Sequence, residues 1–320
     1  MTRHHAVLIL SLCLGALLPL NAQAQSPSVM TSLHPIALLT AEIAGDDIAV
    51  ESLVPPSGSP HTYSLRPSKR RKLQQAELFI WVGPGMEVFL ARVMRQPDLA
   101  EKSVELSRVL EGPMAAHDDH HGHDGHDGHD DHDRGHSSVE QSHSTHAGAG
   151  TDPHMWLDPA LALAMAQRIA EALKTLEGVD KTGVDARLAD FEQRLERHLQ
   201  QLDKQLEPAR DMAIFTYHDA FRRFAEHFDL RLAGYLTITP DQNPGARALS
   251  QLRQRLQQEE SPCVMTEPQF SRDWWQGISN GLPLGLSVWD PMGSDIPVAH
   301  GGYLAFLQQL AERVLECRSV

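Results

Sequence analysis

Apolar residues along the chain follow two spacings, one typical of strands and one typical of helices. Short apolar runs bounded by Gly, Pro or polar residues predict four strands in the first half of the chain, at Val29–Leu33, Ile48–Val54, Leu78–Val82 and Ser103–Leu106. Apolar residues at three- and four-residue steps predict helices at His34–Ala44, Ser68–Gln75, Met86–Met94 and Pro159–Glu177. This alternation of strand and helix predicts a parallel sheet with helices on its faces.

One long helix is predicted at Val184–Leu206, where a narrow apolar stripe runs among charged residues and Gln. Such a stripe fits a rod lying against two bodies better than a helix buried in one core. A second series then predicts strands at Met212–Thr216, Leu232–Ile238, Cys263–Thr266 and Leu286–Trp289, and helices at Asp219–His227, Gly245–Gln258, Ser271–Ser279 and Tyr303–Cys317. We therefore expect an α/β protein of two (β/α)4 lobes joined by a rigid helix, with a ligand in the cleft between them.

The first 24 residues predict a cleavable signal peptide. A basic start precedes the apolar run Ala6–Leu18, and a small-x-small signal places cleavage after Ala24. Cys13 follows Leu12, where a lipid-anchored protein needs a small residue, and no later stretch is apolar for long enough to span a membrane. The mature chain is expected to divide into an N-terminal lobe at 25–183, a linking helix at 184–208 and a C-terminal lobe at 209–320.

The net charge limits the classes of partner that the chain can bind, and its cysteine content indicates its compartment. The formal net charge of −14 at pH 7 disfavours nucleic acid or an anionic membrane as a partner and suits a protein that attracts cations. Cys263 and Cys317 remain after cleavage, and an even number of cysteines in an exported chain predicts one disulfide. The alternative, that both bind a metal, lacks a second Cys or His at ligand spacing.

Residues 117–146 hold ten histidines and eight acidic residues. Because almost nothing there is apolar, we expect a disordered loop at 115–150, inserted in the first lobe. Imidazole and carboxylate together suit zinc, with nickel and copper as competitors, and a solvated acidic linker is the alternative. The expected auxiliary metal ligands of this loop are His117, His120, His121, His123, His126, His129, His132 and His136.

Three histidines outside that loop lie where a strand or loop opens onto the predicted cleft. His61 follows the second predicted strand, His154 precedes a helix, and His218 follows the first strand of the second lobe. Asp290, at the end of the last strand, is a fourth candidate. Three imidazoles plus one carboxylate or water form an ordinary tetrahedral zinc site. A helix cap or a surface position is the alternative for any single one of these histidines.

The chain resembles the ZnuA-type periplasmic zinc-binding proteins, which are the solute-binding subunits of zinc ABC importers. Besides the His/Asp-rich loop, the matching segments are SPHTYSLRPSKRRKLQQAELFIWVGPGMEVFL, DPHMWLDP, FTYHDAFRRFAEHFDL, CVMTEPQF and WDPMG. The resemblance implies zinc bound between the lobes by His61, His154 and His218. Some members have an acidic ligand where this chain has Pro60, so the fourth ligand is either a water molecule, which we favour, or Asp290.

The same resemblance implies a function in transport. It predicts a monomeric periplasmic protein, not an enzyme, that captures Zn²⁺ and delivers it to an inner-membrane ABC permease with its ATPase, while the His-rich loop gathers or senses zinc. One alternative is a zinc-dependent hydrolase with a His₃–water site, in which Glu267 would be the base. We expect Glu267 instead to orient a histidine ligand. A manganese or iron carrier of the same fold is disfavoured, since hard cations prefer more carboxylates.

Overall fold

The computed structural model describes residues 27–111, 152–237, 245–270 and 273–317, so the predicted signal peptide and the His/Asp-rich loop lie outside the described residues. Two four-stranded parallel sheets confirm the predicted α/β class with two lobes. The first sheet has the order β2-β1-β3-β4, with β1 Ser28–Thr31, β2 Ala49–Ser52, β3 Leu78–Trp81 and β4 Ser103–Glu105. The second repeats that order as β6-β5-β7-β8, with β5 Ile214–His218, β6 Leu232–Thr237, β7 Cys263–Thr266 and β8 Gly285–Val288.

Helices connect these strands in both lobes. Those of the first lobe are α1 His34–Ala44, α2 Pro67–Gln75, α3 Pro97–Ala100 and α4 Pro159–Leu173, and α5 Lys181–Leu206 leads to the second lobe. There follow α6 Arg222–His227, α7 Ala246–Gln258, α8 Asp273–Ser279 and α9 Gly302–Cys317, while short 3-10 turns occupy Val88–Leu90, Leu106–Glu111, Met155–Leu157 and Glu207–Ala209. No helix in the described part of the chain combines the length and the apolar composition of a membrane span.

The helix predicted at Met86–Met94 is wrong. The carboxylate of Glu87 accepts hydrogen bonds from the backbone N–H groups of Val82 (3.1 Å) and Gly83 (2.9 Å), just after β3. Glu87 lies at φ −94° and ψ 63°, outside the helical region, and only the turn Val88–Leu90 follows it. A buried carboxylate that binds the backbone four and five residues earlier therefore overrides the helical spacing of the apolar residues.

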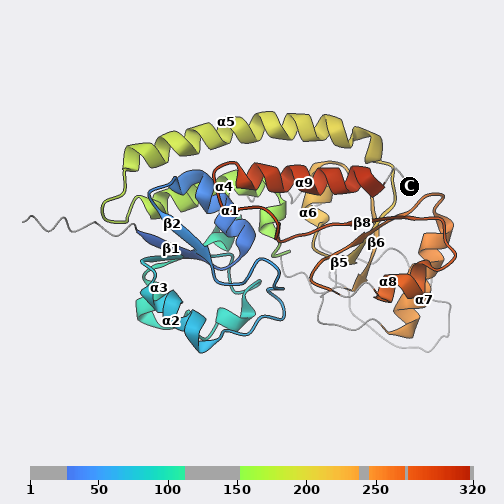
Figure 1. Ribbon diagram of the computed structural model, residues 1–320, viewed down its shortest axis with the longest axis horizontal. Helices are drawn as coiled ribbons and strands as arrows, with labels where there is room; N and C mark the ends of the chain where they lie inside the picture. The colour runs from blue at the N-terminus through green and yellow to red at the C-terminus, as the bar shows by residue number, and fades with distance from the viewer. Residues whose placement is uncertain (1–26, 112–151, 238–244, 271–272, 318–320) are drawn as a thin grey trace, which may run out of the picture.

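Each sheet lies between two layers of helices (Figure 1). On one face, the residues of α1, α4, α5, α6 and α9 form a hydrophobic core that is continuous through both lobes. On the other face, α2 and α3 cover the first sheet and α7 and α8 the second, over two separate cores. The alternation of side chains along a strand produces this division: Leu78 and Ile80 face the shared core, while Phe79 and Trp81 face the separate one.

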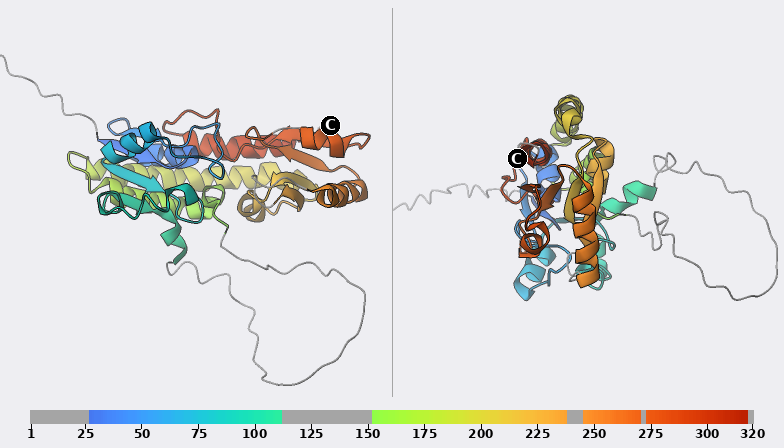
Figure 2. Two further views of the ribbon diagram at one scale, coloured as in Figure 1. Left: turned by 90° about the horizontal axis from the view of Figure 1, so that it is seen from below. Right: turned by 90° about the vertical axis from the view of Figure 1, so that its right-hand side faces the viewer.

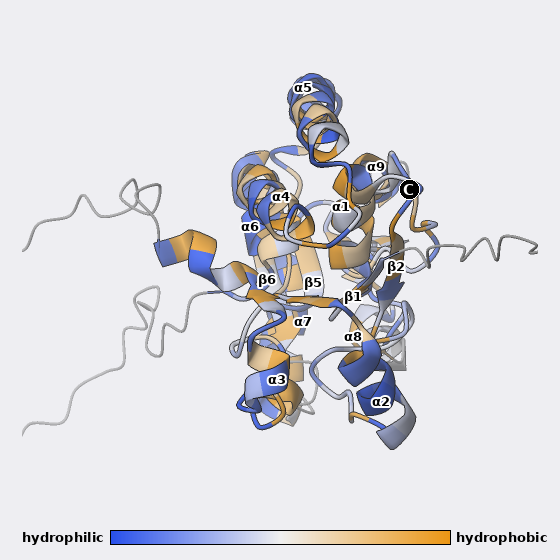
Figure 3. Ribbon diagram, turned by 90° about the vertical axis from the view of Figure 1, so that its left-hand side faces the viewer, coloured by the Kyte–Doolittle hydropathy of each residue, from blue (hydrophilic) through white to orange (hydrophobic). Residues whose placement is uncertain are grey.

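The long helix α5 runs along both lobes, which lie in a row in the view from below (Figure 2), and α9 lies along the second lobe with its start at the boundary with the first. The narrow stripe of α5 is buried as expected, through Val184, Phe191, Leu195, Leu202 and Leu206. α9 contacts α1 and α5 as well as β8. By contrast, α2 is almost wholly hydrophilic and buries only Leu73 (Figure 3).

The two ends of α9 are anchored to different lobes. At its start, the fully buried carboxylate of Glu42 on α1 accepts hydrogen bonds from the N–H groups of Gly301 and Tyr303, both at 3.1 Å. At its end, Cys317 forms a disulfide with Cys263 of β7. α9 therefore joins the lobes as a second strut beside α5.

Candidate metal centre

His218 is the last residue of β5, a central strand of the second sheet. Its side chain is buried, and its Nδ1 lies 2.7 Å from Oε1 of Glu267, which also accepts the His218 backbone N–H at 3.2 Å. Glu267 comes directly after β7, the neighbour of β5, so parallel pairing brings the two residues together at one sheet edge. Its bond to Nδ1 directs Nε2 of His218 away from Glu267, and this buried nitrogen has no hydrogen-bond partner among the described residues.

His154 lies in the loop before the turn Met155–Leu157 and α4. Its Nδ1 is 2.8 Å from Oδ1 of Asp152, which also accepts the His154 backbone N–H at 3.0 Å. Burial lowers the pKa of His154 below its usual value, although the bond to Asp152 opposes this. Burial would raise the pKa of Asp152, but the hydrogen bonds and charge of His154 and the charge of Arg223 outweigh it and hold that pKa low. A carboxylate that accepts the Nδ1–H of a histidine fixes the tautomer, so Nε2 is the nitrogen of His154 that faces the other rings.

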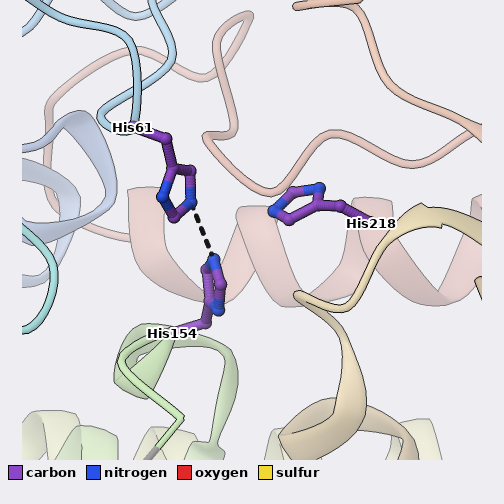
Figure 4. Close-up of side chains that lie close together, drawn as sticks. All are labelled: His61, His154 and His218. Carbon is purple, nitrogen blue, oxygen red and sulfur yellow. Dashed lines mark hydrogen bonds between the residues drawn. The ribbon is translucent and has the colours of Figure 1, made fainter. Parts of the chain in front are cut away.

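The three rings of His61, His154 and His218 converge on one point (Figure 4). His61 reaches it from the loop between β2 and α2, and within the described residues one ring nitrogen of each histidine lies within 4.8 Å of the others. The Nε2 atoms of His61 and His154 share a hydrogen bond of 3.2 Å (Figure 4). Two nitrogens bound tetrahedrally to one zinc ion at about 2.0–2.1 Å would be about 3.3 Å apart, so an ion could replace this hydrogen bond with little movement of the rings.

The space between the rings is small. Its cavity measures about 10 Å³, lined by the three histidines and by Ser59, Pro60, Trp156, Glu267, Gln269, Phe270, Pro291 and Met292. That volume accommodates about one water-sized particle. The space between the rings therefore fits a single bound ion.

The structure does not bring Asp290 into this ligand group. Its Oδ1 accepts hydrogen bonds from Gln269 Nε2 (2.8 Å) and Met292 N (3.0 Å), and its Oδ2 accepts from the backbone N–H (2.7 Å) and hydroxyl (2.6 Å) of Ser294. The carboxylate thus closes the turn after β8. The auxiliary histidines expected between His117 and His136 lie outside the described residues.

Two residues at the site were not anticipated from the sequence. Asp152 accepts a hydrogen bond from Nδ1 of His154. Its position two residues before that histidine in the sequence could have predicted this contact. Arg223 on α6 donates to the backbone carbonyl of Asp152 from Nη2 at 2.8 Å and from Nε at 3.2 Å. No local pattern could have revealed this contact, because the two residues are 71 positions apart.

Two repeated α/β lobes, joined by long helices and with three imidazoles converging between them, define a two-lobed binding protein for a metal ion. The comparison with known families agrees: the model described as "Zinc-uptake complex component A periplasmic" matches residues 29–317. The chain therefore belongs to the ZnuA family of periplasmic zinc-uptake components, as the sequence motifs predicted. The family is one of uptake components and not of enzymes.

Relatives and solved structures cover nearly the whole chain. The High-affinity zinc uptake system protein ZnuA of Yersinia pestis is 34% identical over 294 residues, which is 91% of each chain. The protein of the same name from Paracoccus denitrificans is 32% identical and spans 97% of each chain. The periplasmic zinc-binding protein TroA of Treponema pallidum shares the fold, with a TM-score of 0.71, 19% identity and coverage of 92% of this chain and 99% of that one.

Proposed function

We propose that this protein captures Zn²⁺ in the periplasm with His61, His154 and His218 and delivers it to an inner-membrane ABC permease driven by an ATPase. The observation that carries the proposal is the convergence of three ring nitrogens within 4.8 Å, two of the rings being held at Nδ1 by carboxylates. Such acceptors fix the tautomer that leaves Nε2 free to bind a metal. The relatives named as zinc-uptake proteins support zinc as the cargo.

We assign the fourth coordination position to a water molecule. The oxygens of Asp290 are engaged by Gln269, Met292 and Ser294, and a carboxylate ligand would have to give up some of those hydrogen bonds. A water ligand needs no such rearrangement. Three imidazoles and one water also favour zinc over manganese or iron, which prefer more oxygen ligands.

A hydrolase with the same ligand set is the weaker candidate. Glu267 would be its general base, but its Oε1 accepts both the backbone N–H and the Nδ1–H of His218, and its Oε2 is buried. This contact suits a residue that orients a metal ligand.

The segments outside the described residues complete the proposal. Export by the signal peptide at 1–24 would place a monomer in the periplasm, with lobes at 25–183 and 209–320 joined through 184–208. The histidines of residues 117–146 would supply several weak zinc sites beside the strong one and raise the local zinc concentration. Each should be weaker than the central site, because ordering a loop around an ion costs conformational entropy.

Zinc titration in competition with a chelator tests the central site. The variant that lacks residues 117–146 should retain one tightly bound zinc. His154→Ala or His218→Ala should abolish tight binding. His227→Ala, an exposed histidine on α6, is the matched control and should leave it unchanged. If His218→Ala kept tight binding while the deletion abolished it, the assignment of the central site would be wrong.

Delivery is tested by growth. In a host that lacks its own zinc-uptake component, this chain should restore growth under zinc limitation when its permease and ATPase are co-expressed. His218→Ala should not restore growth, and added zinc should rescue it. Equal growth with His218→Ala and with the wild-type chain would refute the central site as the transport site.

A further inference from the structure

Arg223 links the second lobe to the residue that holds His154 in the first. Its guanidinium is largely buried, with 15% of the side chain exposed, and it donates two hydrogen bonds to the backbone carbonyl of Asp152. Nε also lies 3.7 Å from Asp152 Oδ2, and Nη1 lies 3.6 Å from Asp158 Oδ2. One side chain of α6 thus contacts both ends of the loop that carries His154.

The position of Arg223 in the chain couples two of the three imidazoles. It lies five residues after His218, on the short helix that begins just beyond the end of β5. Asp152, which Arg223 contacts, binds both Nδ1 and the backbone N–H of His154. Movement of the His154 loop away from α6 would therefore separate His154 from His218 and break the Arg223 contacts at the same time.

A guanidinium suits this position better than other cations. Its planar fork donates to the carbonyl of Asp152 through Nε and Nη2 while Nη1 faces the carboxylate of Asp158. A lysine would provide one compact charge and could not reproduce the whole pattern. Because the side chain is largely shielded from water, its charge is less screened than that of an exposed arginine.

We propose that Arg223 is a positioning residue for metal binding, which holds the loop of His154 against the second lobe and slows the release of zinc. It acts through Asp152 and does not touch the ion. This inference rests on the proposed function in zinc capture. It further implies that release to a partner requires the contact between Arg223 and Asp152 to break.

The direction in which loss of the Arg223 charge changes zinc affinity distinguishes a positioning role from simple electrostatic repulsion. A positive charge near a cation site repels the cation, so removing it should by Coulomb's law alone tighten zinc binding. The positioning role predicts the opposite, namely weaker binding and faster release when Arg223 loses its fork. Loss of a residue that orients a ligand weakens metal affinity by about ten- to a hundredfold in other sites.

The test measures zinc release after rapid mixing of the zinc-loaded full chain with excess chelator. Arg223→Gln should release zinc about ten- to a hundredfold faster than the wild type, and Arg223→Lys should be intermediate. Arg222→Gln removes one positive charge from the same helix and is the matched control, because Arg222 forms its ion pair with Asp219 of the second lobe. Its release rate should stay close to that of the wild type.

A double substitution shows whether Arg223 acts through Asp152. In the Asp152→Asn background, adding Arg223→Gln should cause little further acceleration, since residues that act through one another are not additive. Three outcomes would each overturn the proposal. The accelerations of zinc release by Asp152→Asn and Arg223→Gln could be fully additive, Arg223→Gln could release zinc no faster than the wild type, or Arg222→Gln could accelerate release equally. If Arg223→Gln does not fold, Arg223→Lys decides by the same comparison. A wild-type chain that held no zinc against the chelator would instead refute the proposed function.

Discussion

Replacement of Glu267 by Gln isolates the contribution of a carboxylate that does not touch the metal. Glu267 Oε1 accepts the Nδ1–H of His218 at 2.7 Å, and both side chains are at most 3% exposed. Gln keeps the shape and one acceptor oxygen but removes the charge. Its new amide N–H₂ would lie near the position of Oε2, which is buried and has no hydrogen-bond partner among the described residues.

The size of the effect follows from the hydrogen bond that is weakened. A hydrogen bond to a charged group contributes about 1.5–3 kcal/mol and one between neutral groups about 0.5–1.5 kcal/mol. The difference of about 1–1.5 kcal/mol corresponds to about five- to tenfold weaker zinc binding. Glu267→Ala removes the bond altogether, and a loss of about 2–3 kcal/mol corresponds to zinc binding weaker by about thirty- to a hundred-and-sixtyfold.

The assay is equilibrium competition for zinc between the chain and a chelator of known affinity, at neutral pH and with residues 117–146 deleted. Glu259→Gln carries the same charge change at an exposed pair with Arg231 and should bind zinc like the parent. The order of affinities should be parent, Glu267→Gln, Glu267→Ala. Zinc affinity of Glu267→Gln equal to that of the parent, with the metal-free proteins equally stable, would refute the orienting role of the carboxylate.

Three further predictions concern stability and the fourth ligand. Burial raises the pKa of Glu87 to about 7 from 4.5, so the folded state keeps this proton more tightly than the unfolded state does. Urea unfolding of the metal-free chain should therefore show about 3 kcal/mol of stability lost between pH 4.5 and 7, a loss absent from Glu87→Gln. The Cys263→Ser/Cys317→Ser variant, which opens a loop of sequence separation 54, should be less stable by about 4 kcal/mol in the same assay, and an unchanged unfolding midpoint would contradict this. Asp290→Asn should weaken zinc binding in chelator competition by less than about threefold, whereas a loss beyond about tenfold would make Asp290 part of the metal site.

Strand positions were predictable from the sequence because they depend on short runs of neighbouring residues. The run at Leu78–Val82 is apolar throughout and becomes β3, buried on both faces. The helix expected at Met86–Met94 failed because the buried carboxylate of Glu87 binds the backbone of the preceding turn. Periodicity describes where a side chain points if a helix forms, but it does not include such a competing hydrogen bond.

The site was likewise predictable only where neighbouring residues in the sequence determine it. The approximate positions of His61, His154 and His218 follow from loops and strand ends that open onto the cleft, and the family motifs single them out. Asp290 also lies at a strand end, yet its carboxylate binds the backbone of its own turn, a role that Asp side chains often take in turns. Arg223 depends on how two lobes dock, and no run of neighbouring residues records that.

The two struts α5 and α9, and the core that runs beneath them through both lobes, fix how far apart the lobes lie. This has a practical consequence for reporter design. A fluorescent zinc sensor with its donor on one lobe and its acceptor on the other would show little change in energy transfer on loading, because the distance between the dyes hardly varies. An environment-sensitive dye beside the loop of His61, which has no such strut, would give the larger signal.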